Sequence, residues 1–126
     1  MSTLLDQRLA PYGVTAQQAA VLVSVAAGRT APRVLATALR TDTAGLTRLL
    51  DRLEAKELVT RRRSTTDRRS VVVELTDAGR TLTPDLLPRF TEAAHHMFAG
   101  VPERAVRLVG DVLARAVANL RGEDGR

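Results

Sequence analysis

The most regular pattern of apolar and polar positions in the chain lies between residues 43 and 56. Four leucines recur there at positions i, i+3, i+4 and i+7, namely Leu46, Leu49, Leu50 and Leu53. This spacing predicts an amphipathic helix that starts at Asp42 or Thr43. Its other face carries Ala44, Arg48, Asp51 and Ala55 and is flanked by Thr47 and Arg52, so it offers hydroxyl and guanidinium groups over small residues. Such a face can enter a groove about 12 Å wide, although arginines also cover the solvent side of many ordinary helices.

A basic arm and a short alternating segment follow this helix. Residues 59–70 contain five arginines and one aspartate, a net charge of +4 in a chain whose formal net charge is +5. Between Ser70 and Leu75 apolar side chains alternate, so that Val71, Val73 and Leu75 share one face of a strand. The pattern predicts two strands joined by a charged loop, a β-ribbon that carries most of the net positive charge.

Weaker patterns predict the other helices, over about residues 3–10, 16–27, 32–40, 76–99 and 102–120. Thr15 and Gln18 occupy capping-box positions at the start of the second helix, and Pro84 and Pro88 predict a kink or a tightened turn in the long helix. A helix, a tight turn, a reading helix and a ribbon, in this order, are typical of a winged helix-turn-helix. We therefore expect a mainly α fold with a small β-wing (α+β), flanked by N- and C-terminal dimerisation helices.

The last predicted helix has an apolar seam that a domain of this size does not need to support a wing. Its members are Val106, Val109, Leu113, Val117 and Leu120. An apolar face left over after the core is filled usually contacts a second subunit. A two-fold dimer would place two reading helices about 34 Å apart, one turn of B-DNA. The sequence thus predicts a homodimer whose partner is double-stranded DNA.

Composition narrows the classes of function. The chain has 126 residues, the size of one domain, and with 2% aromatic residues its core must be leucine, valine and alanine. There is no cysteine, and the adjacent His95 and His96 would diverge by about 100° on a helix, so we expect no metal site. The sequence has no Gly-rich phosphate loop and no Ser-His-Asp pattern, so we expect neither an enzyme nor a cofactor. It also lacks a signal peptide and an apolar run of membrane-spanning length, which predicts a cytoplasmic protein without a membrane partner.

The charge of the arm suits DNA. Each arginine that neutralises a phosphate releases condensed counterions, and arginine fits the negative potential of a narrow minor groove. Asp67 stands among these arginines, where it can accept a bidentate hydrogen bond and fix the direction of the Arg69 guanidinium. The alternative is a solvated hairpin tip with an incidental ion pair, a contact worth about 0–1 kcal/mol. The neighbouring reading helix favours the DNA interpretation.

Several short motifs in this order resemble the MarR family of bacterial transcription regulators. They are the runs at 46–54 (LTRLLDRLE), 58–61 (LVTR), 67–69 (DRR) and 75–79 (LTDAG), and the likeness extends from Val14 to Leu120. It implies a dimeric repressor, or less often an activator, of pseudo-palindromic operators that is commonly released by small aromatic or lipophilic ligands. We expect one MarR-like domain over 1–126, with a winged helix-turn-helix part at 14–76, dimerisation helices at 1–13 and 77–121, and a disordered tail at 122–126.

The resemblance also implies roles for single residues. The helix from Thr43 to Lys56 enters the major groove, where the candidate base contacts are Thr43, Gly45, Thr47 and Arg48, with Arg52 beside them. Arg48 is the expected bidentate partner of guanine. The expected phosphate contacts are Arg61, Arg62 and Arg68, which set position without reading sequence. Arg69 enters the minor groove, and Asp67 orients it.

An effector site is the least defined expectation. In the family such a site usually lies between the winged part and the dimer helices, so Tyr12, Val14 and Phe90 are candidates to line it, although core packing is the default interpretation of each. The chain departs from the family at Glu57, where glycine is usual because the position tends to be left-handed, at a cost of about 1 kcal/mol for a residue with a Cβ. The segment before Thr15 is also short, so dimerisation should depend more on the last helix.

Two other interpretations are compatible with the charge of the arm. A winged helix can serve protein contacts alone and hold an acidic partner, or it can bind DNA without sequence preference. A protein-contact module would not prefer one duplex over another of equal length, so salt dependence and sequence preference separate these interpretations.

Overall fold

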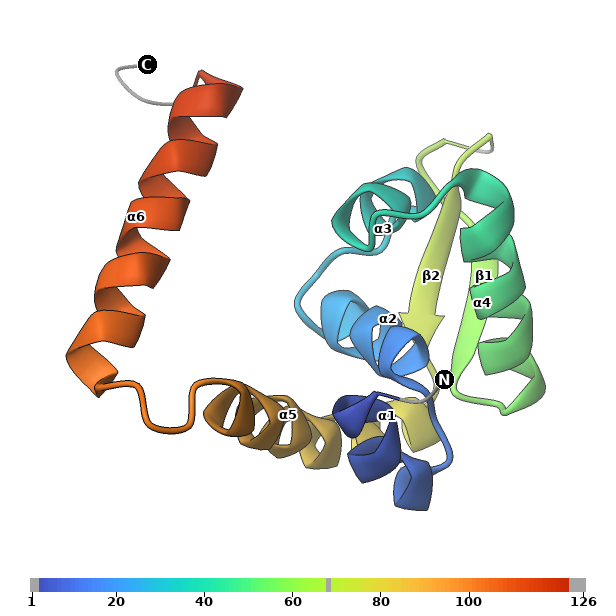
Figure 1. The fold of residues 1–126 in the computed structure, drawn as a ribbon. Coiled ribbons are helices and arrows are strands. Elements are labelled where there is room, and N and C mark those ends of the chain that lie inside the picture. The colour runs from blue at the N-terminus through green and yellow to red at the C-terminus, as the bar shows by residue number, and fades with distance from the viewer. Residues whose placement is uncertain (1–2, 68, 123–126) are drawn as a thin grey trace. The chain divides into compact units, whose positions relative to one another are not determined.

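The computed structural model describes residues 3–67 and 69–122, which are divided between two compact units, 1–93 and 94–126. In chain order the elements are α1 (Leu4–Leu9), the 3-10 helix η1 (Ala10–Tyr12), α2 (Ala16–Ala26), α3 (Pro32–Ala38), α4 (Thr43–Ala55), β1 (Val59–Arg63), β2 (Val71–Leu75), α5 (Asp77–Met97) and α6 (Glu103–Arg121) (Figure 1). The described residues therefore form six α-helices and a two-stranded antiparallel wing, as predicted. The predicted tail lies outside the described residues except for Gly122, the C-cap of α6.

Two helices start at side-chain caps that the sequence predicted. The Thr15 hydroxyl accepts from the N–H of Gln18 (3.2 Å), and the Gln18 side chain accepts from the N–H of Thr15 (3.2 Å). These reciprocal bonds form a capping box that starts α2. Asp42 Oδ1 accepts from the N–H of Gly45 (2.7 Å), so α4 begins at Thr43.

The core of the first unit consists of leucine, valine and alanine, as the low aromatic content requires. All four leucines of the α4 stripe are buried, and they belong to one cluster with Leu22 of α2, Leu35 of α3 and Val73 of β2. Full burial of a leucine is worth about 1.5–3 kcal/mol relative to exposure. The stripe therefore fixes which face of α4 points outward.

The wing is anchored to the core at its base. β1 and β2 pair in an antiparallel register that sets Arg63 opposite Val71, and β2 begins one residue later than predicted. Its central residue, Val73, is fully buried. The N–H of Val73 donates to the carbonyl oxygen of Thr30 (2.9 Å), which attaches the loop before α3 to the edge of β2.

Among the described residues, two that are not glycine adopt positive φ. Glu57, just after α4, has φ 60°, the left-handed conformation expected at this position, whereas Arg40, after α3, has φ 54°, which the sequence did not predict. Gly79, in the first turn of α5, is required by a close approach: a Cβ on Gly79 would lie 2.2 Å from the carbonyl oxygen of Leu58. This contact between the start of α5 and the turn before β1 explains the glycine of the LTDAG motif.

The two C-terminal helices follow the predicted bounds closely. α5 contains Pro84 and Pro88 and continues through both as one helix, where the sequence predicted a kink or a tightened turn. α6, in the second unit, keeps its apolar seam on the surface: Val109 is 52% exposed and Leu113 60%. Among the described residues no single helix is long and apolar enough to span a membrane. One pair bent by 70°, α1 and η1 with α2, meets the criteria of length and composition together, and much of α2 is buried in the core.

Candidate nucleic-acid interface

The outward face of α4 offers hydroxyl and guanidinium groups. Thr43, Thr47, Arg48 and Arg52 are all exposed, and the Thr47 hydroxyl donates to the carbonyl oxygen of Thr43 (2.9 Å). The structure gives the Arg48 and Arg52 guanidinium groups no hydrogen-bond partner within residues 3–67 and 69–122. Guanidinium donors and hydroxyl lone pairs are the groups that bind base edges in a major groove.

Gly45 differs from the exposed residues of this face, because its backbone is packed against the turn before α4. Its N–H donates to the Asp42 carboxylate (2.7 Å) and is therefore already used inside the protein. A Cβ on Gly45 would lie 2.2 Å from Oγ1 of Thr41. Gly45 therefore shapes the turn between α3 and α4, and its expected base contact stays a prediction.

The Arg61 guanidinium is bound within the protein, to two acidic residues of α4. Its Nε donates to Glu54 Oε1 (2.9 Å), and its Nη2 donates to the carboxylates of both Glu54 and Asp51. Hydrogen bonds to Glu54 and then to Asp51 raise the pKa of Arg61 above its ordinary value. The structure uses this side chain to hold β1 against α4, and the phosphate contact that the sequence predicts for Arg61 stays a prediction.

Arg62 is paired across the wing. Its Nε donates to Glu74 Oε1 (2.6 Å) and its Nη2 donates to Glu74 Oε2 (3.2 Å). These bonds raise the pKa of Arg62 and lower that of Glu74. Both side chains are exposed, and an exposed pair is worth only about 0–1 kcal/mol. A phosphate can therefore compete with Glu74 for Arg62, and the phosphate contact of Arg62 stays a prediction.

Asp67 shapes the main chain of the wing loop. Its Oδ1 accepts from the N–H of Arg69 (3.0 Å) and its Oδ2 accepts from the Ser70 hydroxyl (3.0 Å). The N–H of Ser70 donates to the Asp67 carbonyl oxygen (3.0 Å). The sequence predicts a bond to the Arg69 guanidinium, but the structure shows Asp67 fixing the backbone from which that side chain extends. Arg68, the third expected phosphate contact, lies outside the described residues.

The three candidate ligand-lining residues lie in the first unit. Val14 is buried, at 4% exposure, while Tyr12 and Phe90 are partly buried and pack against the core. Arg89 lies over the Tyr12 ring, 5.7 Å from its centroid, and its Nη1 donates to the Tyr12 hydroxyl (3.3 Å). Val14 also lines a hollow of about 540 Å³ at the corner of α1 and α2, together with Arg52 of α4. Packing accounts for all three residues, and their role towards a ligand stays a prediction.

Sequence reasoning missed the charged residues that attach α4 to its surroundings. Asp51 and Glu54 bind Arg61, and Lys56 Nζ donates to the carbonyl oxygen of Gly13 (2.6 Å) and to Oε1 of Gln18 (2.7 Å). Two acidic residues beside an arginine-rich strand were an available signal for the Arg61 bridge. No signal marked Lys56, because one of its partners is a main-chain carbonyl.

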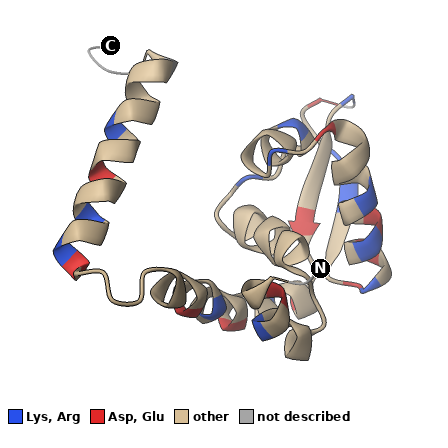
Figure 2. Ribbon diagram, viewed as in Figure 1, with Lys and Arg blue, Asp and Glu red and all other residues tan. Residues whose placement is uncertain are grey.

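Charge on the first unit is mixed rather than uniformly basic. Figure 2 shows acidic and basic bands interspersed along α4. Arg48 and Arg52 form no ion pair with the described residues, whereas Arg61 and Arg62 are paired with carboxylates of the protein. Two helices joined by a short turn, the second with a free polar face, and a β-wing after it define a winged helix-turn-helix protein.

Comparison with known proteins gives the family. A family model described as the MarR family matches residues 12–70. The multiple antibiotic resistance protein MarR of Escherichia coli (strain K12) is 42% identical over 77 residues, which is 60% of this chain and 54% of that protein. The chain spans about half the length of the curated relatives it matches.

Two solved structures extend the likeness to most of the chain. A mutant MarR from E. coli complexed with operator DNA is 29% identical with a TM-score of 0.79, covering 90% of this chain and 82% of that one. CouR from Rhodococcus jostii RHA1 bound to p-coumaroyl-CoA is 28% identical with a TM-score of 0.76, covering 87% and 78%. The chain belongs to the MarR family, whose members are transcription regulators rather than enzymes, and it has the winged-helix fold of that family.

Proposed function

We propose that this protein is a sequence-specific DNA-binding transcription regulator, a dimeric repressor of a pseudo-palindromic operator. The observation that carries the proposal is the outward face of α4, where Thr43, Thr47, Arg48 and Arg52 are exposed opposite a buried leucine stripe. A face of this composition fits a major groove. The likeness to a MarR structure complexed with operator DNA supports the same use of the helix.

In the proposed complex the contacts divide between reading and positioning. Arg48 binds guanine through two hydrogen bonds, while the hydroxyl groups of Thr43 and Thr47 contact neighbouring base edges. Arg69 enters the minor groove from a loop that Asp67 shapes. The expected contacts with the DNA backbone are Arg61, Arg62 and Arg68, and Arg52 lies beside the base contacts of α4.

The dimer part of the proposal rests on α6. Its exposed seam includes Val109, Leu113 and Leu120, the last 89% exposed. Burying such a seam against a second copy would remove apolar surface from water, which is worth about 25 cal/mol per Å². We assign residues 14–76 to DNA reading and residues 1–13 and 77–121 to dimerisation. A two-fold dimer would present two α4 helices about one helical turn of DNA apart.

Release by a small aromatic or lipophilic ligand is the finer part of the proposal. It is supported by the structure of CouR bound to p-coumaroyl-CoA, to which this chain is 28% identical. In this chain Tyr12, Val14 and Phe90 are the residues we expect near such a ligand: Val14 is buried in the core, and Tyr12 and Phe90 pack against it.

The test is selection of bound duplexes from a random-sequence library, followed by affinity measurements on the enriched duplex and on scrambled DNA at two salt concentrations. We expect an inverted repeat with half-sites about 10 base pairs apart, centre to centre. Binding without enrichment would contradict sequence-specific recognition and leave a non-specific DNA binder. Failure to bind any duplex would leave a winged-helix module for protein contacts.

A further inference from the structure

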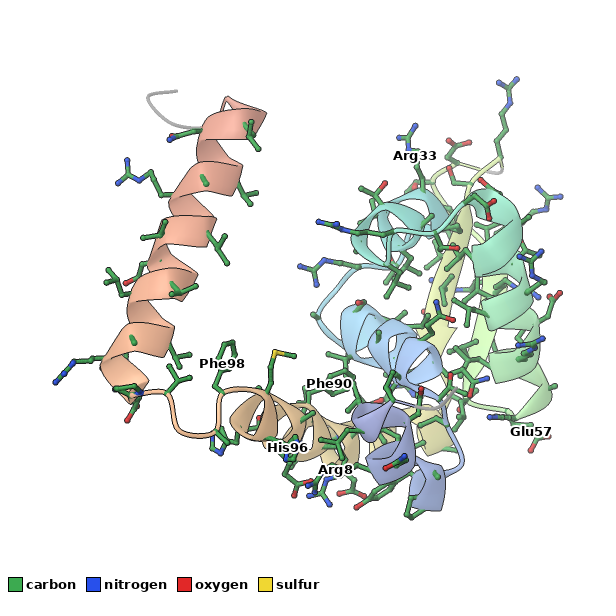
Figure 3. All side chains as sticks on the ribbon, in the orientation of Figure 1. Arg8, Arg33, Glu57, Phe90, His96 and Phe98 are labelled. Atoms are coloured by element: carbon green, nitrogen blue, oxygen red, sulfur yellow. The ribbon has the colours of Figure 1, made fainter. Side chains whose placement is uncertain are left out.

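Arg33 is a free cation at the entrance to the reading helix. It lies in the first turn of α3 and is exposed, and the described part of the chain offers its guanidinium no hydrogen-bond or ion-pair partner. It lines a groove of about 400 Å³ together with Thr43 and Thr47 of α4 and Val71 at the outer end of β2. Figure 3 shows the labelled side chain projecting from α3 at the end of the first unit where the wing loop lies.

Two arginines of the wing are already paired with carboxylates of the protein, so the wing offers fewer unpaired cations to DNA than its sequence suggests. Arg61 is bound to Glu54 and Asp51, and Arg62 is paired with Glu74. A phosphate that bound either arginine would have to displace a carboxylate first. Within residues 3–67 and 69–122 Arg33 has no such competitor, and it stands beside the two threonines that are expected to face the bases.

The position of Arg33 in the fold suits a contact with the sugar-phosphate backbone that borders the DNA major groove, rather than with the bases at its floor. When the second helix of a helix-turn-helix lies in the major groove, the first helix crosses the sugar-phosphate backbone. Arg33 belongs to that first helix, α3, and its long side chain borders the groove between α3 and α4. A single guanidinium there meets a phosphate before it meets a base.

We propose that Arg33 contacts a DNA phosphate at the edge of the major groove and positions α4 within it. The inference rests on the proposed DNA-binding function and deepens it, because none of the residues expected to bind DNA belongs to α3. The contact carries no sequence information of its own.

The test replaces Arg33 with glutamine and measures operator affinity between 50 and 200 mM salt. The slope of log affinity against log salt is negative, and each lost phosphate contact makes it shallower by about 0.9. Over this fourfold range of salt the ratio of variant Kd to wild-type Kd should therefore shrink about 3.5-fold for one contact and about 12-fold for the two contacts of a dimer. Base preference should stay the same at every operator position.

Two matched variants make the result decisive. Arg107→Gln removes the same charge from an exposed side chain of α6 that pairs with Glu103, and it should leave the salt slope unchanged. Arg33→Lys should restore most of the slope, because a phosphate accepts a point charge. Thermal unfolding of Arg33→Gln should match the wild type, since the described structure gives the side chain no partner.

Three results would overturn the proposal. The first is a salt slope for Arg33→Gln equal to that of Arg107→Gln, and the second is a changed base preference at one operator position, which would make Arg33 a base contact. Failure of Arg33→Lys to restore the slope is the third. If Arg48→Ala weakens the operator while Arg33→Gln does not, only this inference fails. If the wild type prefers no duplex and neither variant alters binding, the proposed function fails with it.

Discussion

Glu57 holds a left-handed backbone conformation at the point where α4 turns into the wing. Its φ is 60°, and the turn is fixed from both sides: its N–H donates to the carbonyl oxygen of Glu54 (2.9 Å), and its own carbonyl oxygen accepts from the Thr76 hydroxyl (2.6 Å). The side chain is exposed and points away from the core (Figure 3). Glu57→Gly therefore removes the Cβ without removing a packed group.

The expected gain is the strain that is relieved minus the entropy that glycine adds to the unfolded chain. A residue with a Cβ in the left-handed region costs about 1–2 kcal/mol. The extra freedom of glycine in the unfolded state costs about 0.4–1 kcal/mol. The difference of the central values is about 0.8 kcal/mol in favour of Glu57→Gly, and at about 4 °C per kcal/mol this raises Tm by about 3 °C.

Urea and thermal unfolding of the wild type, Glu57→Gly and Glu57→Ala measure this difference. Glu57→Ala keeps the Cβ and removes the carboxylate, so it should show little of the gain in the free energy of unfolding. Equal stabilisation of both variants would mean that the carboxylate, not the backbone, sets the cost. A less stable Glu57→Gly would refute the strain argument, because the turn would then need the side chain.

Three further predictions concern DNA binding and assembly. Arg48→Ala should cost about 1–3 kcal/mol of binding free energy and relax base preference at one operator position, whereas Arg62→Ala should weaken binding to all duplexes alike. Titration of single-base operator variants separates the two effects. Uniform weakening by both variants would contradict the division between reading and positioning. Asp67→Ala should weaken operator binding although it removes a negative charge, because the wing loop loses two hydrogen bonds. A gel-shift or anisotropy titration measures this, and tighter binding would show that Asp67 repels phosphate. Leu113→Glu should convert the dimer to a monomer in sedimentation velocity, since it places a charge in the middle of the α6 seam, and an unchanged sedimentation coefficient would exclude that seam as the interface.

The sequence predicted those parts of the structure that local spacing determines. The stripe of four leucines identified α4 because a helix buries every third or fourth residue, and the same count set its outward face. Thr15 and Asp42 marked helix starts because a side-chain cap acts within three residues of its own position. Glu57 was identified as left-handed from the family pattern, and its φ confirms it.

The sequence did not show how charges would pair between elements. Five arginines in the arm indicated a uniformly basic wing, yet two of them are matched by carboxylates of α4 and β2. Which arginine meets which carboxylate depends on strand register and on the packing of β1 beside α4, and neither follows from charge counts. The same holds for Arg33, whose importance appears only when α3 is seen to share a groove with Thr43 and Thr47.

Arg61 links α4 to the wing. Its guanidinium binds Asp51 and Glu54, three residues apart on α4, and its main-chain N–H donates to the Glu54 carboxylate (3.2 Å). Moving β1 away from α4 would break charge-assisted bonds at a partly buried site, where such bonds are strong. In the proposed complex the helix and the wing must therefore enter their two grooves together. An effector that displaced α4 would withdraw Arg69 from the minor groove in the same step, so that loss of one contact with a half-site entails loss of the other.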